Sequence, residues 1–176
     1  MQRINLGKTA PDLYKKVAEL DQIATAKVYQ SGIAEGFSHL LKLRASQINQ
    51  CAFCIRMHTQ DALKTGESID RITLLNAWRE TEYFKDDERA ALALIEELTL
   101  ISNQQISDEV YAEAQKYYSE EQLSAIEWLG IVINAWNRIA ISSLCSETLN
   151  KAIKKSILNA LLILSIPMFF RFLKQT

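Results

Sequence analysis

Apolar residues recur at intervals of three and four along most of the chain, which is the spacing of one face of an α-helix. Ser31-Gly32 and Gly66 interrupt this pattern, and serine precedes several of the runs, as expected of residues that end and cap helices. The pattern predicts helices at 11–30, 35–48, 51–65, 69–78, 88–101, 108–118 and 120–141. No alternation of apolar and polar residues extends beyond a few positions, so the sequence predicts an all-α, multi-helix bundle.

The C-terminal segment differs in composition from the rest of the chain. Residues 151–155 are basic, and residues 157–170 are nearly all apolar. This apolar run is shorter than the roughly 20 residues that a membrane-spanning helix needs, and Pro167 interrupts it. We therefore expect a helical domain over 1–145 and an apolar helical extension over 146–176. The extension is expected to pack against protein rather than to anchor the chain in a membrane.

Composition limits the possible partners and compartments. The chain has 176 residues, a length that suits a single globular domain. Its formal net charge of −1 provides no positive field that would attract nucleic acid. Three cysteines in a chain of this length do not form a secreted disulfide framework, and the N-terminus lacks the apolar core of a signal peptide. We therefore predict a cytoplasmic protein that does not bind nucleic acid. In a reducing compartment a CxxC pair is more often catalytic or metal-binding than structural.

The rare reactive residues gather in one segment. Cys51 and Cys54 form a CxxC pair at the start of the third predicted helix, for which Asn49 is the expected cap. His58 follows Cys54 by four residues and therefore lies on the same helical face. His39, the other histidine of the chain, lies in the preceding helix. Redox or metal chemistry is the first hypothesis for such a cluster.

The free N–H groups and dipole of the helix N-terminus favour a thiolate at Cys51 or Cys54. A lower thiol pKa raises the thiolate fraction but also lowers its nucleophilicity, so the net gain is only a few-fold. A positioned acid contributes about 10²–10⁴ in rate, and His58 is the candidate for that acid. The second cysteine would condense with a sulfenic acid to form a disulfide, which completes half of a peroxidase cycle.

A metal site is the alternative chemistry. His39, Cys51, Cys54 and His58 together could form a tetrahedral Cys2His2 site. Zinc modules with these ligands usually belong to small domains that fold only with metal, whereas this chain has an ample apolar core. We therefore predict no resident metal and no cofactor. A pair of buried thiols beside a core histidine is the purely structural alternative.

Several motifs resemble the alkylhydroperoxidase D-like, carboxymuconolactone decarboxylase superfamily. The resemblance covers roughly residues 11–143, and its motifs lie at 41–58, 76–80, 88–92 and 133–138. It implies an all-helical subunit of the alkylhydroperoxidase D-like type that assembles as a trimer or hexamer. It also implies thiol peroxidase activity, with a dithiol or thioredoxin-like protein as the reductant. Members that act as decarboxylases lack the cysteine pair.

By position, the resemblance makes Cys54 the peroxidatic cysteine, Cys51 its partner and His58 the proton-relay histidine. The family pattern places a glutamate where this chain has His39. A histidine can accept or donate a hydrogen bond but supplies no anion to hold His58. His39 thus relays protons itself, weakens the relay, or marks a site that has drifted toward metal binding. Glu35, one helical turn earlier, is a possible substitute carboxylate.

The leading hypothesis is an enzyme: a CxxC thiol peroxidase that reduces organic hydroperoxides or hydrogen peroxide. A dithiol–disulfide oxidoreductase and a non-enzymatic, metal-binding or redox-sensing helical oligomer are the alternatives. Outside the motif, Trp78 and Trp136 are expected in the core or an interface, and Cys145 is expected to be an inert buried thiol. Arg44, Arg79 and Arg138 are expected to pair with carboxylates.

Overall fold

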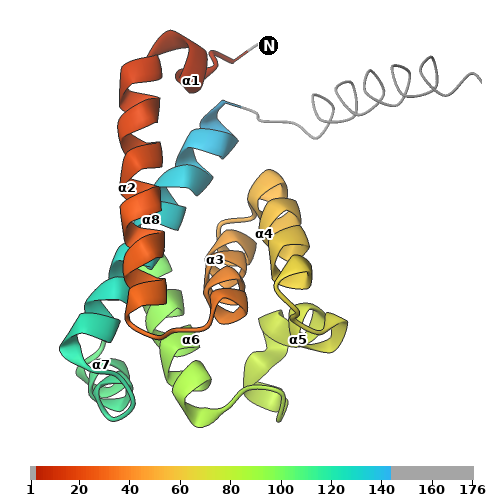
Figure 1. Ribbon diagram of the computed structural model, residues 1–176, viewed down its shortest axis with the longest axis vertical. Helices are drawn as coiled ribbons and strands as arrows, with labels where there is room; N and C mark the ends of the chain where they lie inside the picture. The colour runs from red at the N-terminus through yellow and green to blue at the C-terminus, as the bar shows by residue number, and fades with distance from the viewer. Residues whose placement is uncertain (1–2, 144–176) are drawn as a thin grey trace, which may run out of the picture. The chain divides into compact units, whose positions relative to one another are not determined.

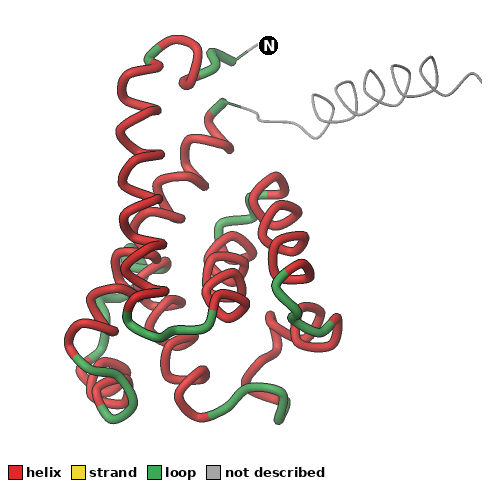
Figure 2. Tube along the Cα trace, in the orientation of Figure 1, coloured by secondary structure: helices red, strands yellow, loops and turns green. Residues whose placement is uncertain are grey.

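A computed structural model of the protein describes residues 3–143, and all regular structure within that range is helical (Figures 1 and 2). The helices are α1 Leu6–Thr9, α2 Pro11–Gln30, α3 Glu35–Ile48, α4 Ala52–Lys64, α5 Ile69–Leu74, the 3-10 helix η1 Leu75–Glu80, α6 Asp86–Thr99, α7 Asp108–Gln115 and α8 Glu120–Ser142. The all-α prediction is confirmed. None of these helices is long and apolar enough to cross a membrane. Cys145 and the predicted extension at 146–176 lie outside the described residues.

Helix boundaries lie close to those of the sequence pattern, and two of the differences have a local cause. Asn49 was predicted to cap α4, and this is wrong. Asn49 is the C-cap of α3, and Cys51 is the N-cap of α4. The reason is a left-handed residue, Gln50 (φ 56°), which turns the chain so that only Cys51 has the extended backbone of an N-cap. Helix α6 begins earlier than predicted because the Glu88 carboxylate accepts a hydrogen bond from the Lys85 backbone.

Helix α3 is the centre of the bundle. It contacts α4, α6 and α8, and Leu40, Leu41 and Leu43 on α3 are fully or almost fully buried. Helices α2 and α8 run side by side, as Figure 1 shows, and α4 lies on the other side of α3. The two helices that carry the histidines, α3 and α4, are therefore packed against each other.

A carboxylate in α6 holds three helical segments together. Glu96 is buried and accepts hydrogen bonds from Arg44 Nε (2.6 Å), Trp78 Nε1 (2.8 Å) and Arg79 Nη1 (2.5 Å). Burial raises the pKa of Glu96, but these three donors outweigh it and hold the pKa below its ordinary value. The expected pairing of Arg44 and Arg79 with a carboxylate is confirmed. The same prediction is wrong for Arg138, which donates hydrogen bonds to the backbone and side-chain oxygens of Asn134.

The substitution Glu96→Gln should lower the free energy of unfolding by about 3 kcal/mol at pH 7, because it leaves Arg44 without its buried partner. Since the folded-state pKa lies below the ordinary 4.5, the stabilisation is complete above pH 4.5 and is lost as the pH falls through the folded value. Urea unfolding at pH 7 and pH 3 should show a smaller difference from wild type at pH 3. The exposed Glu82→Gln is the control, with an expected change below about 0.5 kcal/mol.

Candidate redox site

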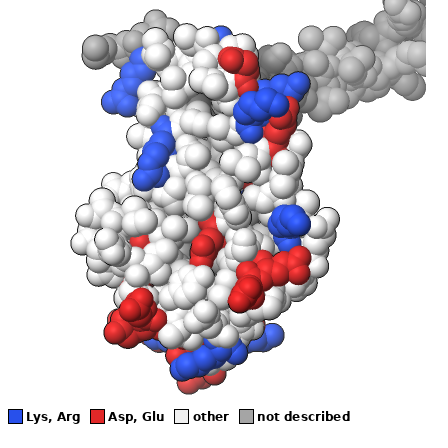
Figure 3. Space-filling view, turned by 90° about the vertical axis from the view of Figure 1, so that its left-hand side faces the viewer, with Lys and Arg blue, Asp and Glu red and all other residues white. Residues whose placement is uncertain are grey.

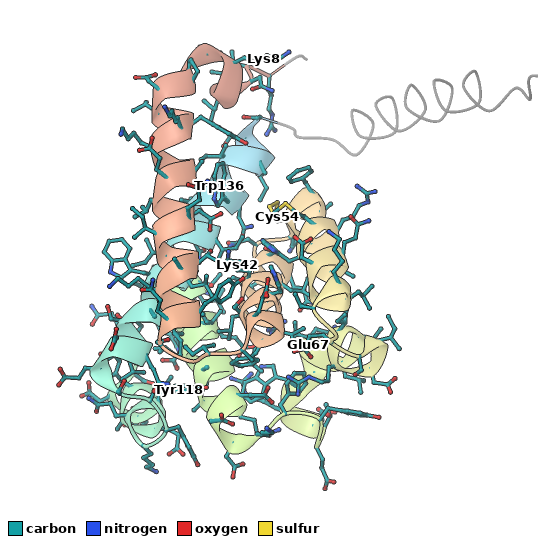
Figure 4. The ribbon with its side chains drawn as sticks, viewed as in Figure 1. Lys8, Lys42, Cys54, Glu67, Tyr118 and Trp136 are labelled. Atoms are coloured by element: carbon teal, nitrogen blue, oxygen red, sulfur yellow. A yellow bond between two sulfur atoms is a disulfide. The ribbon has the colours of Figure 1, made fainter. Side chains whose placement is uncertain are left out.

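The two cysteines of the CxxC motif lie at the N-terminus of α4. Cys51 is the N-cap, and the Cys54 backbone N–H points at Cys51 Sγ at 3.4 Å. The sulfurs are joined in a disulfide, with 5.3 Å between the Cα atoms (Figure 4). This Cα separation lies within the ordinary range for a disulfide, so the motif can hold the oxidised pair in this helical turn.

Both cysteines are buried, each with 2% of its surface exposed. They pack with Phe53 of α4 and Ala140 of α8 in a small cluster separate from the main core. The apolar surroundings exclude most water from the sulfurs. Phe53, which packs against this cluster, is itself half-buried.

Asparagine side chains hold the turn before Cys51 against α8. Asn49 Nδ2 donates to the side-chain oxygens of Asn134 and Asn137, both at 2.9 Å. Asn137 is fully buried and its Nδ2 donates in turn to Ser46 Oγ at 3.1 Å. The motif at 133–138 therefore contributes to the site by positioning the chain that leads into the CxxC turn. Its signal in the sequence was two asparagines that follow an apolar run within the predicted helix.

The structure brings the two histidines together across the α3–α4 contact. The ring centroids of His39 and His58 lie 6.0 Å apart, with 29° between the ring planes. His58 is buried, with 5% of its surface exposed, and His39 is half-buried. Neither ring nitrogen of His58 has a hydrogen-bond partner within residues 3–143.

Burial keeps both imidazoles neutral near pH 7. It lowers the pKa of His58 from 6.5 to about 3, with further contributions from the charges of Lys42 and His39. Burial and Lys42 also lower the pKa of His39, against the opposing charges of Asp61 and Glu35. A neutral imidazole can accept a proton on one nitrogen and donate from the other.

Two charged residues beside the histidines were missed by sequence reasoning. Lys42 is a buried ammonium whose Nζ donates to Asp21 Oδ1 (3.2 Å) and Thr25 Oγ1 (2.9 Å) on α2. Asp61 follows His58 by three residues on α4, and one ligand atom from each of His39, His58 and Asp61 lies within 4.8 Å of the other two. The i, i+3 spacing from His58 to Asp61 was the available signal.

Asp61, rather than Glu35, is the carboxylate beside His58. Burial raises the pKa of Asp61, but the hydrogen bond and charge of Lys64, followed by the two histidines, outweigh it and lower the pKa. Glu35 is exposed and makes no hydrogen bond to His58. The site therefore contains an anion, although it comes from α4 and not from the position where the family pattern has glutamate.

Comparison with known proteins identifies a family, a related protein and a related crystal structure. The sequence profile of the carboxymuconolactone decarboxylase family matches residues 11–97. The chain is 40% identical over 141 residues to the uncharacterized protein YdfG of Bacillus subtilis (strain 168), a match that covers 80% of this chain and 93% of that protein. A crystal structure from Agrobacterium tumefaciens, of a protein of unknown function proposed to be the antioxidant defence protein AhpD, is 35% identical with a TM-score of 0.76. That match covers 83% of this chain and 97% of the Agrobacterium chain.

Proposed function

Because this chain belongs to the carboxymuconolactone decarboxylase family and has the CxxC pair, we propose that it is a thiol-dependent peroxidase acting on organic hydroperoxides or hydrogen peroxide. The observation that carries the proposal is the pairing of Cys51 and Cys54 at the N-terminus of α4, one turn before the buried His58. The antioxidant role proposed for the Agrobacterium relative supports the same chemistry.

The proposed cycle begins with the reduced pair. Cys54 Sγ attacks one oxygen of the peroxide, the O–O bond breaks, and the departing alkoxide takes a proton to leave as an alcohol. Cys54 is then a sulfenic acid, and the Cys51 thiol displaces its hydroxyl as water to form the disulfide. The sum is one dithiol and one hydroperoxide giving one disulfide, one alcohol and one water. A dithiol or a thioredoxin-like protein then reduces the disulfide and starts the next cycle.

His58 is the proposed carrier of the proton in the first step. It accepts the proton of the Cys54 thiol and gives it to the departing alkoxide, so no net proton is needed from solvent. Because burial penalises the charged ring, the imidazolium is short-lived. Asp61 is the group whose charge would stabilise it, and His39 is the neighbouring ring that would help to orient it.

Peroxide consumption by the reduced protein tests this function. With cumene hydroperoxide and excess dithiothreitol, the protein should turn over many equivalents. A dithiol–disulfide oxidoreductase would instead reduce disulfide substrates faster than peroxide. A non-enzymatic sensor would consume one equivalent and stop, even with the reductant present. Either of these outcomes would contradict the peroxidase assignment.

We also propose that the protein is a homo-oligomer, a trimer or hexamer, in which α2 and α8 contact another subunit. Several large apolar side chains on these helices are exposed, and they are Leu13, Leu20, Ile23, Trp128 and Ile131. A groove lined by Leu20, Ile23 and Trp128 runs between the two helices. Figure 3 views the side on which α2 lies in Figure 1, and uncharged residues cover much of it. Large apolar side chains that are exposed together beside a groove are typical of a contact between subunits.

The substitution Ile23→Glu should dissociate the oligomer, because it places a charge within the buried centre of the proposed contact. Light scattering coupled to size-exclusion chromatography should report about 20.0 kDa for the variant and a multiple of that mass for wild type. Ile69→Glu on α5 is the matched control, since Ile69 is 57% exposed and Ile23 is 59% exposed. Dissociation by both variants, or by neither, would contradict this location for the contact.

A further inference from the structure

His39, His58 and Asp61 form a cluster of potential metal ligands beside the disulfide. They come from α3 and α4, which pack against each other in the centre and on the right of Figure 1. One nitrogen or oxygen of each lies within 4.8 Å of the others. On a tetrahedral zinc ion, neighbouring ligand atoms are about 3.3 Å apart. The distance between any two of these ligand atoms therefore has to shorten by at most about 1.5 Å. Rotations of the side chains can supply a shift of this size.

The buried nitrogens of this cluster lack protein partners. Within residues 3–143, His39 Nδ1 and both nitrogens of His58 are buried without a hydrogen bond. A buried polar group left unpaired costs about 1–3 kcal/mol, so such groups need an explanation. In the proposed peroxide cycle His39 and Asp61 only support His58, and that role does not require all three ligand atoms to lie within 4.8 Å of one another. A bound cation would pair one nitrogen of each imidazole and one oxygen of Asp61.

We propose that His39, His58 and Asp61 bind one divalent transition-metal ion of the zinc or ferrous class. Two imidazoles and one carboxylate are a donor set that both ions accept, with the remaining positions open to water. The three ligands come from the His39 side chain on α3 and from His58 and Asp61, one turn apart, on α4.

Two lysines set the strength of binding. Lys64 donates to Asp61 Oδ1 at 2.6 Å but is 71% exposed, so releasing Asp61 to a metal costs little. Lys42 is buried near both histidines and its charge opposes a second cation, although Asp21 partly neutralises it. The site therefore suits an exchangeable ion rather than a permanent structural one.

This ligand set differs from the Cys2His2 set that the sequence suggested. In the disulfide form the sulfurs of Cys51 and Cys54 are bonded to each other and supply no thiolate. The His39–His58–Asp61 set is complete in that form. Metal binding by the oxidised protein thus distinguishes the Cys2His2 set from the His39–His58–Asp61 set, whether or not the protein is a peroxidase.

If the protein is a peroxidase, a metal bound to His58 would block proton transfer, so that zinc would inhibit peroxide reduction reversibly.

The test is a titration of the full-length, tag-free, oxidised protein with Co²⁺, followed by competition with Zn²⁺. One equivalent of Co²⁺ should give visible d–d absorption without a thiolate charge-transfer band, and Zn²⁺ should abolish it. Asp61→Asn and His39→Gln should each weaken binding at least 10-fold, since even outer-shell changes cost about 10–100-fold. Asp70→Asn, an exposed acid on α5, is the control and should bind as wild type does.

Thermal unfolding of each variant without metal checks that it folds, and His39→Gln serves as the second ligand variant if Asp61→Asn does not. Absence of Co²⁺ binding by the oxidised wild type would overturn the proposal. So would unchanged affinity in both ligand variants, or binding that needs the reduced thiols and shows the charge-transfer band.

Discussion

Replacing Cys54 with serine is expected to abolish peroxide consumption, whereas replacing Cys51 is expected to preserve the first chemical step. Cys54 is the sulfur one helical turn before His58, and Cys51 lies a further turn away at the N-cap of α4. A serine hydroxyl at position 54 is not ionised near neutral pH and cannot replace the thiolate as nucleophile. Cys51 is needed only to convert the sulfenic acid on Cys54 into the disulfide.

A single-turnover assay without added reductant separates these expectations. Cys51→Ser should consume one equivalent of cumene hydroperoxide and retain a sulfenic acid that dimedone traps on Cys54. Wild type should consume one equivalent and end as the disulfide, with no dimedone adduct. Consumption by Cys54→Ser that matches wild type and leaves no dimedone adduct would remove the peroxidase assignment. The same consumption with an adduct on Cys51 in Cys54→Ser would reverse the roles of the two cysteines.

Replacing His58 with glutamine should lower the rate of peroxide reduction by about 10²–10⁴. Glutamine keeps a polar side chain of similar reach but cannot accept the Cys54 proton and pass it to the alkoxide. The rate should be measured with saturating dithiothreitol and with EDTA present, so that a metal bound to the histidines does not affect it. Urea unfolding provides the control for folding, because His58 is buried.

The companion variant His39→Glu tests what the unusual histidine does. It places a carboxylate near His58, where the family pattern has one, and should raise the rate because an anion stabilises the transient imidazolium. A lower rate in His39→Glu would show that His39 itself relays the proton. An unchanged rate in His58→Gln would exclude the histidine from the reaction altogether.

Much of the fold could be predicted because it depends on neighbouring residues. Apolar spacing predicted α2 and α3 with their observed bounds, and two of the serines that precede predicted helices, Ser107 and Ser119, are the N-caps of α7 and α8. Helix α1 is only a single turn and has no periodicity to detect. The predicted helix at 69–78 is in fact α5 and η1, with non-helical backbone at Ala77.

Of the candidate site, too, one part could be predicted from the sequence and another part could not. The sequence by itself determined that Cys54 and His58 share a helical face at a helix N-terminus, since helix geometry sets the position of residues four apart. Only the tertiary structure decided that His39 faces His58, that Asp61 and Lys42 lie beside them, and that burial keeps both rings neutral. Those features depend on how α3 packs against α4 and α2, and no local spacing encodes the distance between two helices or the loss of water around a side chain.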